Sequence, residues 1–301
     1  MRAVVTGGAG FIGSHLVDAL LAAGIEVHVI DNLSTGGLAR VPLDAHVHVL
    51  DVRDERAKAL VAALKPDVLF HQAAQVDVQR SVREPDYDAS VNVVGTVNML
   101  EAARLSGAKF IFASSCAVYG DRPTPVREDD PTEPISFYGL SKWAGERYVR
   151  LFHARYGVPY TVLRYANVYG PRQTPKGEGG VVAIFMDRIR EGLPVTVFGD
   201  GNQTRDFVYV KDVVAANVAA IDKGHGQTLH VSTGTETSVN ELLRTIRGIH
   251  PKAVYARREP ERPGDIRHSR LANDRALAEL GWSPTRDLGS GLLETYRAFI
   301  G

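Results

Sequence analysis

The chain has 301 residues, of which 44% are hydrophobic and 23% are charged, and these values exclude a disordered or collagen-like protein. Lys and Arg together count 35, as do Asp and Glu, so no global field would attract nucleic acid or an anionic membrane. The lone Cys116 excludes an internal disulfide and a thiolate zinc site. A strand pattern begins at Met1, and no run approaches the roughly 20 apolar residues that cross a bilayer, so we expect a cytoplasmic protein.

The first half of the chain alternates short apolar runs with longer helical patterns. The apolar runs predict parallel strands covered on both faces, at 3–6, 25–30, 46–50, 68–70 and 109–113. The segments between them predict helices at 11–23, 54–64 and 87–105. Strand and helix in steady alternation indicate right-handed βαβ units. The expected fold class is therefore α/β, a Rossmann-type doubly wound parallel sheet.

A helix over 137–156 and a strand over 160–164 follow, and then the composition changes. Residues 170–180 are dense in Gly and Pro, which marks a loop or a domain boundary. Beyond them we predict a helix over 181–191 and strands over 195–198 and 207–210, without regular alternation. We expect a Rossmann domain over 1–170, joined by part of 206–231, and a smaller C-terminal substrate lobe over 171–301.

A glycine-rich turn follows the first predicted strand and opens the first predicted helix. Gly7, Gly10 and Gly13 recur at every third position, with Phe11 and Ile12 before the last glycine. This spacing suits a tight turn, close approach of the backbone to a pyrophosphate, and close helix packing. The helix N-terminus would offer unpaired N–H groups and a positive dipole end to the phosphates. The turn therefore predicts a dinucleotide site.

Two carboxylates indicate which dinucleotide binds. Asp31 ends the second predicted strand, 18 residues after Gly13, where it can accept hydrogen bonds from both ribose hydroxyls. The same carboxylate would repel a 2′-phosphate, which favours NAD over NADP. Asp51 and Val52 close the third strand, where they suit the adenine edge. NAD is the expected cofactor.

Tyr138 and Lys142 stand four residues apart in the predicted helix over 137–156, hence on one face of it. A nearby ammonium favours phenolate, so we expect the pKa of the tyrosine to fall toward the working range of a general base. Such a phenolate suits removal of a proton from a sugar hydroxyl as hydride leaves its carbon. The pair therefore indicates an oxidoreductase-like active site.

With these residues in place, the sequence resembles the extended short-chain dehydrogenase/reductases, and among them the NAD-dependent epimerase/dehydratase family. Beyond the glycine turn and the Tyr138/Lys142 pair, the family's motifs match in order along nearly the whole chain. They lie at 31–36, 71–74, 92–96, 114–120, 163–172, 205–210 and 262–265. The resemblance implies an enzyme that binds NAD and a UDP-sugar and needs no metal.

The resemblance also implies a role for individual residues. Ser115, Tyr138 and Lys142 would be catalytic, with Ser115 helping to pass a proton between the sugar oxygen and Tyr138. The cofactor would contact Gly7, Gly10, Phe11, Ile12, Gly13, Asp31, Asn32, Ser34, Thr35, Gly36, Asp51, Val52, Ala73, Ala74, Asn92, Tyr138, Lys142 and Tyr165. The UDP-sugar would contact Ser115, Tyr138, Asn167, Val182, Arg205, Arg262, Asp265 and Ser269. His71 would shape the nicotinamide pocket and would not act as a base.

The residues after Ser115 reduce the number of reactions that the resemblance allows. At the positions of Ser115, Cys116 and Ala117, dehydratases of the family carry Thr-Asp-Glu, and UDP-glucuronate decarboxylases carry Thr-Ser-Glu. This chain therefore lacks the acidic residues that both reactions need. GDP-sugar 3,5-epimerases need a cysteine two residues beyond the serine. Cys116 is one residue beyond it, and at a strand end this offset points it to the other side, as a small buried apolar residue. What remains is inversion at sugar C4 through a 4-keto intermediate.

The sugar itself is left open by the sequence. Ser269 falls at the family's pocket-size position, with His268 as the neighbouring alternative, and a small residue there would leave room for an N-acetyl group. UDP-glucose and UDP-galactose, their N-acetylated forms and UDP-glucuronate all remain candidates. A 4-keto reductase and a non-catalytic NAD-binding regulator are the rival classes, and the Tyr138/Lys142 pair weighs against the second. The resemblance further implies a homodimer formed by the helices over 87–105 and 137–156.

Overall fold

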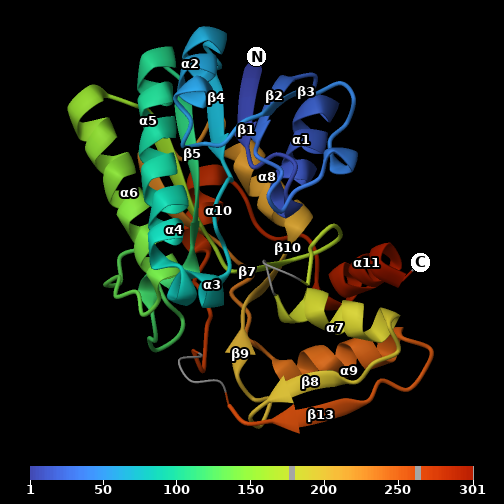
Figure 1. Ribbon diagram of the computed structural model, residues 1–301. Coiled ribbons are helices and arrows are strands. Elements are labelled where there is room, and N and C mark those ends of the chain that lie inside the picture. Colours follow the sequence, from blue (N-terminus) through green and yellow to red (C-terminus); the bar gives the residue numbers. More distant parts are fainter. Residues whose placement is uncertain (176–179, 262–265, 301) are drawn as a thin grey trace.

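Seven parallel strands form the central sheet of the computed structural model, which describes residues 1–175, 180–261 and 266–300 (Figure 1). They are β1 (Arg2–Thr6), β2 (Glu26–Asp31), β3 (His46–Val49), β4 (Val68–His71), β5 (Lys109–Ser115), β6 (Tyr160–Tyr165) and β11 (Gln227–Val231). Their order across the sheet is β11-β6-β5-β4-β1-β2-β3. The order reverses between β1 and β4, and in open α/β sheets ligands bind at the carboxyl ends of the strands beside such a reversal.

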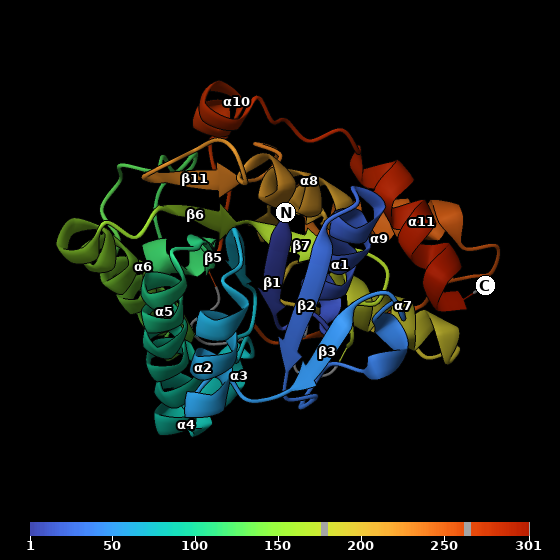
Figure 2. The same ribbon diagram turned by 90° about the horizontal axis from the view of Figure 1, so that it is seen from above.

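Helices cover both faces of this sheet (Figure 2). One face carries α1 (Phe11–Ala22), α8 (Val210–Ala219) and α10 (Asp274–Leu280), and the other α2 (Glu55–Leu64), α5 (Gly95–Ser106) and α6 (Phe137–Tyr156). Successive strand residues belong to opposite layers, as the strand period requires. Val5 packs in the α1 layer, for example, and Val4 packs in the α5 layer. Burial on both faces explains why inner strands such as β1 and β4 read as apolar runs, whereas the edge strand β3 is partly exposed and alternates His with Val.

The predicted helix over 87–105 is the least regular of the long elements. The structure has α3 (Val78–Arg83), α4 (Pro85–Ala89), a π-helical turn η2 (Ser90–Val94) and then α5. The predicted helical segment is present, and the structure divides it by a π-helical turn between two α-helices. Asn92 lies in the π-helical turn and is buried. Such turns are frequent where a helix supports a functional site. Single 3₁₀ turns, η1 (Leu38–Arg40) and η3 (Cys116–Tyr119), follow β2 and β5 along the chain.

The smaller lobe packs its own apolar cluster between α7 (Val181–Arg190), α9 (Val239–Ile249) and α11 (Leu288–Ile300). Three short strand pairs surround it. They are β8 (Val195–Phe198) with β13 (Ala256–Glu259), β9 (Thr204–Arg205) with β12 (Thr237–Ser238), and β7 (Asn167–Tyr169) with β10 (Phe207–Tyr209). Part of this C-terminal half belongs to the larger lobe: α8 packs on α1, and β11 pairs with β6. The predicted α/β fold class, with a Rossmann-type sheet and a smaller lobe, is confirmed.

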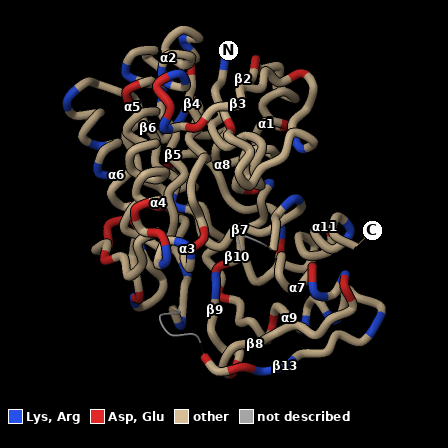
Figure 3. The backbone as a smooth tube through the Cα atoms, viewed as in Figure 1, with Lys and Arg blue, Asp and Glu red and all other residues tan. Residues whose placement is uncertain are grey.

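Charged residues of both signs are interspersed over the two lobes, in keeping with the zero net charge (Figure 3). Within the described part of the chain, no helix combines the length and the apolar character that a membrane crossing requires.

Candidate active site

A cavity of about 680 Å³ lies at the carboxyl ends of the central strands and reaches α7 and β9 of the smaller lobe. It collects most residues that the sequence predicts for the site. Those in its lining are Gly7, Gly10, Phe11, Ile12, Gly13, Asp31, Asn32, Ser34, Thr35, Asp51, Val52, Ala73, Ala74, Ser115, Tyr138, Tyr165, Asn167, Val182, Arg205 and Ser269. Gly36, Asn92 and Lys142 are not part of the lining. Arg262 and Asp265 lie outside the described residues.

The glycine turn between β1 and α1 leaves no room for side chains. Gly7 has a φ of +69°, and a Cβ built on it would lie 2.7 Å from the backbone nitrogen of Ala73. A Cβ on Gly13 would lie 2.1 Å from the carbonyl oxygen of Gly7. Gly10 precedes α1 without a side-chain cap, and the first turn holds no acid. The first N–H groups of α1 are therefore available to an anion in the cavity.

Replacing Gly13 with alanine is expected to lower the free energy of unfolding by about 1–3 kcal/mol, because the new methyl group meets backbone that cannot move aside. A urea titration measures this effect. Gly248→Ala near the end of α9 is the matched control, since a Cβ there meets nothing within 4 Å. It should leave stability unchanged or raise it by up to about 1 kcal/mol. Equal stability of the two variants would contradict the steric argument.

Asp31 and Asp51 lie on the cavity wall beside the glycine turn. The carboxylate of Asp31 accepts hydrogen bonds from the backbone N–H groups of Ala9 at 2.9 Å and Leu33 at 2.8 Å. Asp51 accepts from the Arg53 guanidinium at 2.8 Å and from the Asn32 amide at 2.8 Å. Hydrogen bonding by Arg53 holds the pKa of Asp51 well below its usual range. The two carboxylates are thus fixed in orientation before any ligand binds.

Ser115 and Tyr138 meet on the opposite wall. Ser115 is the last residue of β5, and its hydroxyl accepts from the N–H of Ala117 at 3.1 Å. Tyr138 stands in the first turn of α6, which Ser136 caps by accepting from the N–H of Gly139 at 3.0 Å. Burial raises the pKa of the Tyr138 phenol above its ordinary range, and hydrogen bonding with Ser115 partly offsets this. The arrangement gives a phenol and a hydroxyl that can share a proton.

Lys142 lies one turn further along α6 and is buried behind the cavity wall. Its Nζ donates to the carbonyl oxygen of Ala113 at 2.9 Å and lies 5.2 Å from the centroid of the Phe112 ring. Burial lowers the pKa of Lys142 to about 8. The expectation that Lys142 lowers the pKa of Tyr138 is not met in the chain alone. Burial of the phenol is the larger effect, and it favours the neutral form.

Asn92 and His71 stand behind the cavity wall. The Asn92 amide donates to the carbonyl of Gln75 at 2.9 Å and to the Ser141 hydroxyl at 3.0 Å, so it ties the segment after β4 to α6. His71 contacts Thr6 at 2.8 Å, and burial lowers the pKa of its ring to about 3. A neutral, enclosed imidazole agrees with the expectation that His71 is not a base. It does not line the cavity.

Cys116 does not follow the sequence expectation. It lines the same cavity as Ser115, although strand alternation predicted that it points to the other side. The physical reason is that β5 ends at Ser115 and residues Cys116–Tyr119 form a 3₁₀ turn, so the period of two stops there. Burial raises the pKa of the Cys116 thiol, which disfavours a reactive thiolate.

The far end of the cavity is made by Asn167, Val182, Arg205 and Ser269. The side-chain oxygen Oδ1 of Asn167 is buried and has no hydrogen-bond partner among the described residues. A buried acceptor without a partner is costly, so its presence beside the cavity marks a place where a hydrogen-bond donor of a ligand would be stabilised.

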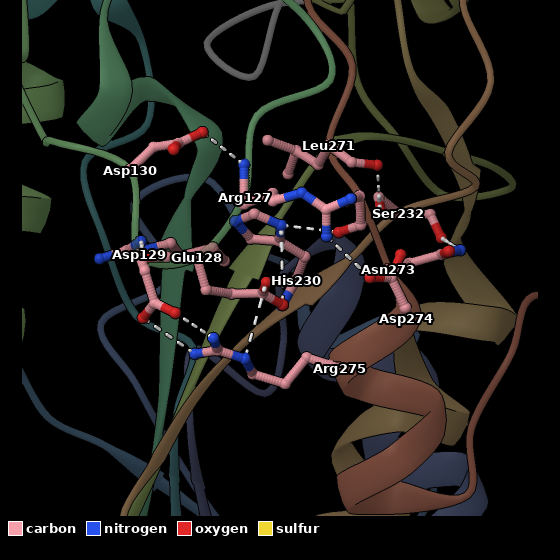
Figure 4. Close-up of polar contacts among 12 residues, drawn as sticks. Arg127, Glu128, Asp129, Asp130, His230, Ser232, Leu271, Asn273, Asp274 and Arg275 are labelled. Carbon is pink, nitrogen blue, oxygen red and sulfur yellow. Dashed lines mark hydrogen bonds and ion pairs between the residues drawn. The ribbon is translucent and has the colours of Figure 1, made fainter.

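A buried polar network holds residues 271–275, which closely follow Ser269 in the chain (Figure 4). The His230 ring contacts the carbonyl oxygen of Ala272 at 2.7 Å, and Glu128 accepts from the backbone N–H of His230 at 3.1 Å. Arg275 then pairs with Glu128 at 3.9 Å. Burial lowers the pKa of His230 to about 3, so the ring is neutral and positions the segment by hydrogen bonding.

Sequence reasoning did not find several cavity residues. Arg80 and Tyr87 line the cavity, with the Arg80 guanidinium 4.1 Å from the centroid of the Tyr87 ring. Gln173 lines it as well. Arg80 and Tyr87 lie in the short helices α3 and α4, and Gln173 lies in a loop, so no motif or long periodic pattern marks them as site residues.

Comparisons with known proteins agree with this geometry. The model of the NAD dependent epimerase/dehydratase family matches residues 3–232. A UDP-glucose 4-epimerase of Mycolicibacterium smegmatis is 46% identical over 312 residues, covering 99% of this chain and 98% of that protein.

Two solved structures are similar over their whole length. The Thermotoga maritima UDP-glucose 4-epimerase with UDP-glucose has a TM-score of 0.95 at 44% identity and covers 99% of this chain and 98% of its own. The Thermus thermophilus UDP-glucose 4-epimerase in complex with NAD has a TM-score of 0.94 at 41% identity. The match covers 100% of this chain and 99% of that chain. With the family model matching most of its length, the chain belongs to the NAD dependent epimerase/dehydratase family.

Proposed function

We propose that the protein interconverts UDP-glucose and UDP-galactose by inverting C4 of the hexose through a 4-keto intermediate, with NAD as its cofactor. The observation that carries the proposal is the position of Ser115 and Tyr138. They are hydrogen-bonded to each other and line the same cavity as the glycine turn. The likeness to the UDP-glucose 4-epimerase of M. smegmatis over nearly the whole of both chains supports the same reaction.

The described residues fit NAD. The glycine turn is a cradle that a single Cβ would fill, and the uncapped start of α1 suits the pyrophosphate. The Asp31 carboxylate would accept from the adenosine ribose, and Asp51 would contact the adenine. Asn32, Ser34 and Thr35, which follow β2, and Tyr165, which ends β6, line the same cavity and would complete the site. When bound, NAD would supply the hydride acceptor and donor that oxidation and reduction at C4 require.

Proton transfer falls to the chain's own residues. The Tyr138 oxygen would take the proton of the C4 hydroxyl as the C4–H bond breaks, directly or through the Ser115 hydroxyl, and would return it when C4 is reduced. Lys142, with a pKa of about 8, is largely protonated at neutral pH and would favour the phenolate that this transfer requires. Its bond to Ala113 fixes the ammonium behind the wall.

Inversion requires the sugar to turn while the nucleotide stays bound. Arg205 would bind the diphosphate, since a planar guanidinium suits phosphate oxygens, and the side-chain amide of Asn167 would supply a second contact. Val182 would line the nucleotide pocket, and the resemblance assigns Arg262 and Asp265 to the diphosphate and the uridine ribose. Such anchoring leaves the hexose able to present either face to the cofactor.

Incubation with UDP-glucose, UDP-N-acetylglucosamine and UDP-glucuronate in separate reactions tests the proposal, with NMR of the product sugars as the measurement. UDP-galactose is expected from the first. If only UDP-glucuronate is converted, the substrate is the 6-carboxylate sugar and the proposal of UDP-glucose is wrong. Loss of the 4-hydroxyl without inversion would contradict epimerisation.

A small residue at Ser269 leaves space beside the far end of the cavity, so the protein is also expected to invert UDP-N-acetylglucosamine. Ser269→Tyr should reduce the kcat/KM for the N-acetylated substrate by at least about tenfold, because a phenol ring would fill the space of the acetamido group. The kcat/KM for UDP-glucose should change much less. Equal loss on both substrates would show that Ser269 does not discriminate between them.

We also propose that the protein is a homodimer through α5 and α6. These helices pack against each other, and their outer faces expose large apolar side chains, including Leu105, Tyr148 and Leu151. Leu151→Glu is expected to convert dimer into monomer, which analytical ultracentrifugation measures. Leu43→Glu, at an exposed apolar position outside these helices, is the control and should leave the mass unchanged. A monomeric wild-type protein would overturn this assignment.

A further inference from the structure

Three histidines and one glutamate gather at the amino ends of β2 and β3, at the open edge of the sheet. They are Glu26, His28, His46 and His48, named here the edge cluster. Because the cavity lies at the carboxyl ends of the strands, the edge cluster stands at the other end of β2 and β3. The epimerase function proposed above uses none of these residues.

The strand register brings the edge cluster together. His28 lies opposite His46 in the parallel pairing of β2 with β3. The strand period of two puts Glu26 on the same face as His28, and His48 on the same face as His46. The His28 ring stacks with both neighbours, at centroid distances of 4.7 Å to His46 and 5.4 Å to His48. The backbone of the sheet therefore fixes where these rings stand.

The spacing of the possible ligand atoms suits a metal ion. One ligand atom each from Glu26, His28 and His46 lies within 4.8 Å of the other two. Zn²⁺ binds imidazole nitrogen and carboxylate oxygen at about 2.0–2.2 Å, so two of its ligand atoms lie at most about 4 Å apart. Glu26 and His46 are exposed, so rotation about their side-chain bonds can close the remaining difference.

Hydrogen bonding alone does not account for the edge cluster. The His28 ring contacts Glu26 through Nε2 at 2.9 Å and His48 through Nδ1 at 3.1 Å. The ring nitrogens of His46, by contrast, have no hydrogen-bond partner in the described part of the chain. Arg2 pairs with Glu26 at 2.8 Å, but water screens this exposed pair, so a metal ion can compete for the carboxylate.

The contact between His28 and His48 suits a metal ligand supported by a second residue. With the Nδ1–H of His28 donating to Nε2 of His48 at 3.1 Å, Nε2 of His28 keeps its lone pair for a metal. Such support from a second residue orients a ligand histidine and raises its affinity.

We propose that Glu26, His28 and His46 bind a divalent transition-metal ion, with Zn²⁺ as the best fit and His48 as the residue that orients His28. Two imidazoles and a carboxylate suit Zn²⁺, and also Cu²⁺ and Ni²⁺, whereas Mg²⁺ and Ca²⁺ prefer sites made of oxygen ligands. The ion joins the edge strand β3 to β2. Because the folded chain alone holds these ligands in place, the ion stabilises it in proportion to the logarithm of its concentration.

Isothermal titration of the full chain with zinc chloride tests the proposal. We expect one Zn²⁺ per chain in the wild type and a loss of affinity of roughly tenfold or more in His46→Asn. His225→Asn is the matched control, since His225 is exposed and lies away from the edge cluster. It should bind zinc as the wild type does. Wild-type protein that takes up no zinc, or a His46→Asn variant with wild-type affinity, would overturn the proposal.

Thermal unfolding gives an independent measurement. The midpoint Tm of the wild type should rise with added zinc and stay unchanged with magnesium, and the rise should be absent in His46→Asn. Because His46 is exposed, the zinc-free variant should melt at the wild-type temperature, which separates loss of the site from loss of the fold. An equal rise with magnesium would assign the effect to nonspecific binding. Neither measurement depends on the epimerase activity.

Discussion

Replacing Tyr138 with phenylalanine is expected to lower the rate of C4 inversion by about 10²- to 10⁴-fold, the usual contribution of a positioned acid or base. The substitution removes only the phenol oxygen. That oxygen is the group that would take the proton of the C4 hydroxyl. In this proposal Ser115 only relays the proton to Tyr138, so without the phenol oxygen the proton has no assigned acceptor. The rate is measured by following UDP-galactose formation from UDP-glucose.

Cofactor retention distinguishes a chemical effect from a structural one. Tyr138→Phe should keep the NAD content of the wild type, because the glycine turn and Asp31 hold the other end of the cofactor in this proposal. Tyr255→Phe, which removes a phenol oxygen from a strongly exposed ring, is the control and should keep full activity. A wild-type rate in Tyr138→Phe would remove this residue from the chemistry. Loss of NAD would mean that the variant disturbs the site itself.

Much of the larger lobe could be predicted from the sequence because its constraints are local. A continuous apolar run such as 110–113 has few alternatives to a strand buried on both faces, and it lies within β5 as observed. The glycine turn is equally constrained, since the close approach of Gly13 to Gly7 excludes every side chain. Such features depend on a few neighbouring residues, so a single sequence reveals them.

Other features of the site depend on packing between distant segments. The raised pKa of Tyr138 comes from burial, which α6 alone does not determine. The orientation of Cys116 depends on where β5 ends, and alternation along the strand could not locate that point to one residue. Glu128 and His230 are 102 residues apart in the chain, and neither belongs to a periodic pattern that would pair them.

Glu146 and Arg164 form an ion pair that the sequence did not indicate and that is expected to be among the strongest determinants of stability. The two side chains lie 2.6 Å apart and are 2% and 3% exposed. Glu146→Gln leaves the guanidinium buried without a counter-charge, so the free energy of unfolding should fall by about 3–5 kcal/mol. Urea titration measures the change. Asp187→Asn breaks the more exposed pair with Arg190 and should cost about 0–1 kcal/mol.

A double variant tests whether the cost comes from the isolated charge. Glu146→Met together with Arg164→Met removes both charges and fills similar volume, so it should recover most of the stability lost in Glu146→Gln. A double variant as unstable as the single one would mean that the pair contributes through its other contacts. The chief candidate is the Ser114 hydroxyl, which donates to Glu146 at 2.6 Å and lies next to Ser115. Through Ser114, the buried pair would help to hold Ser115 in place, so Glu146→Gln should also reduce turnover under conditions where the variant remains folded.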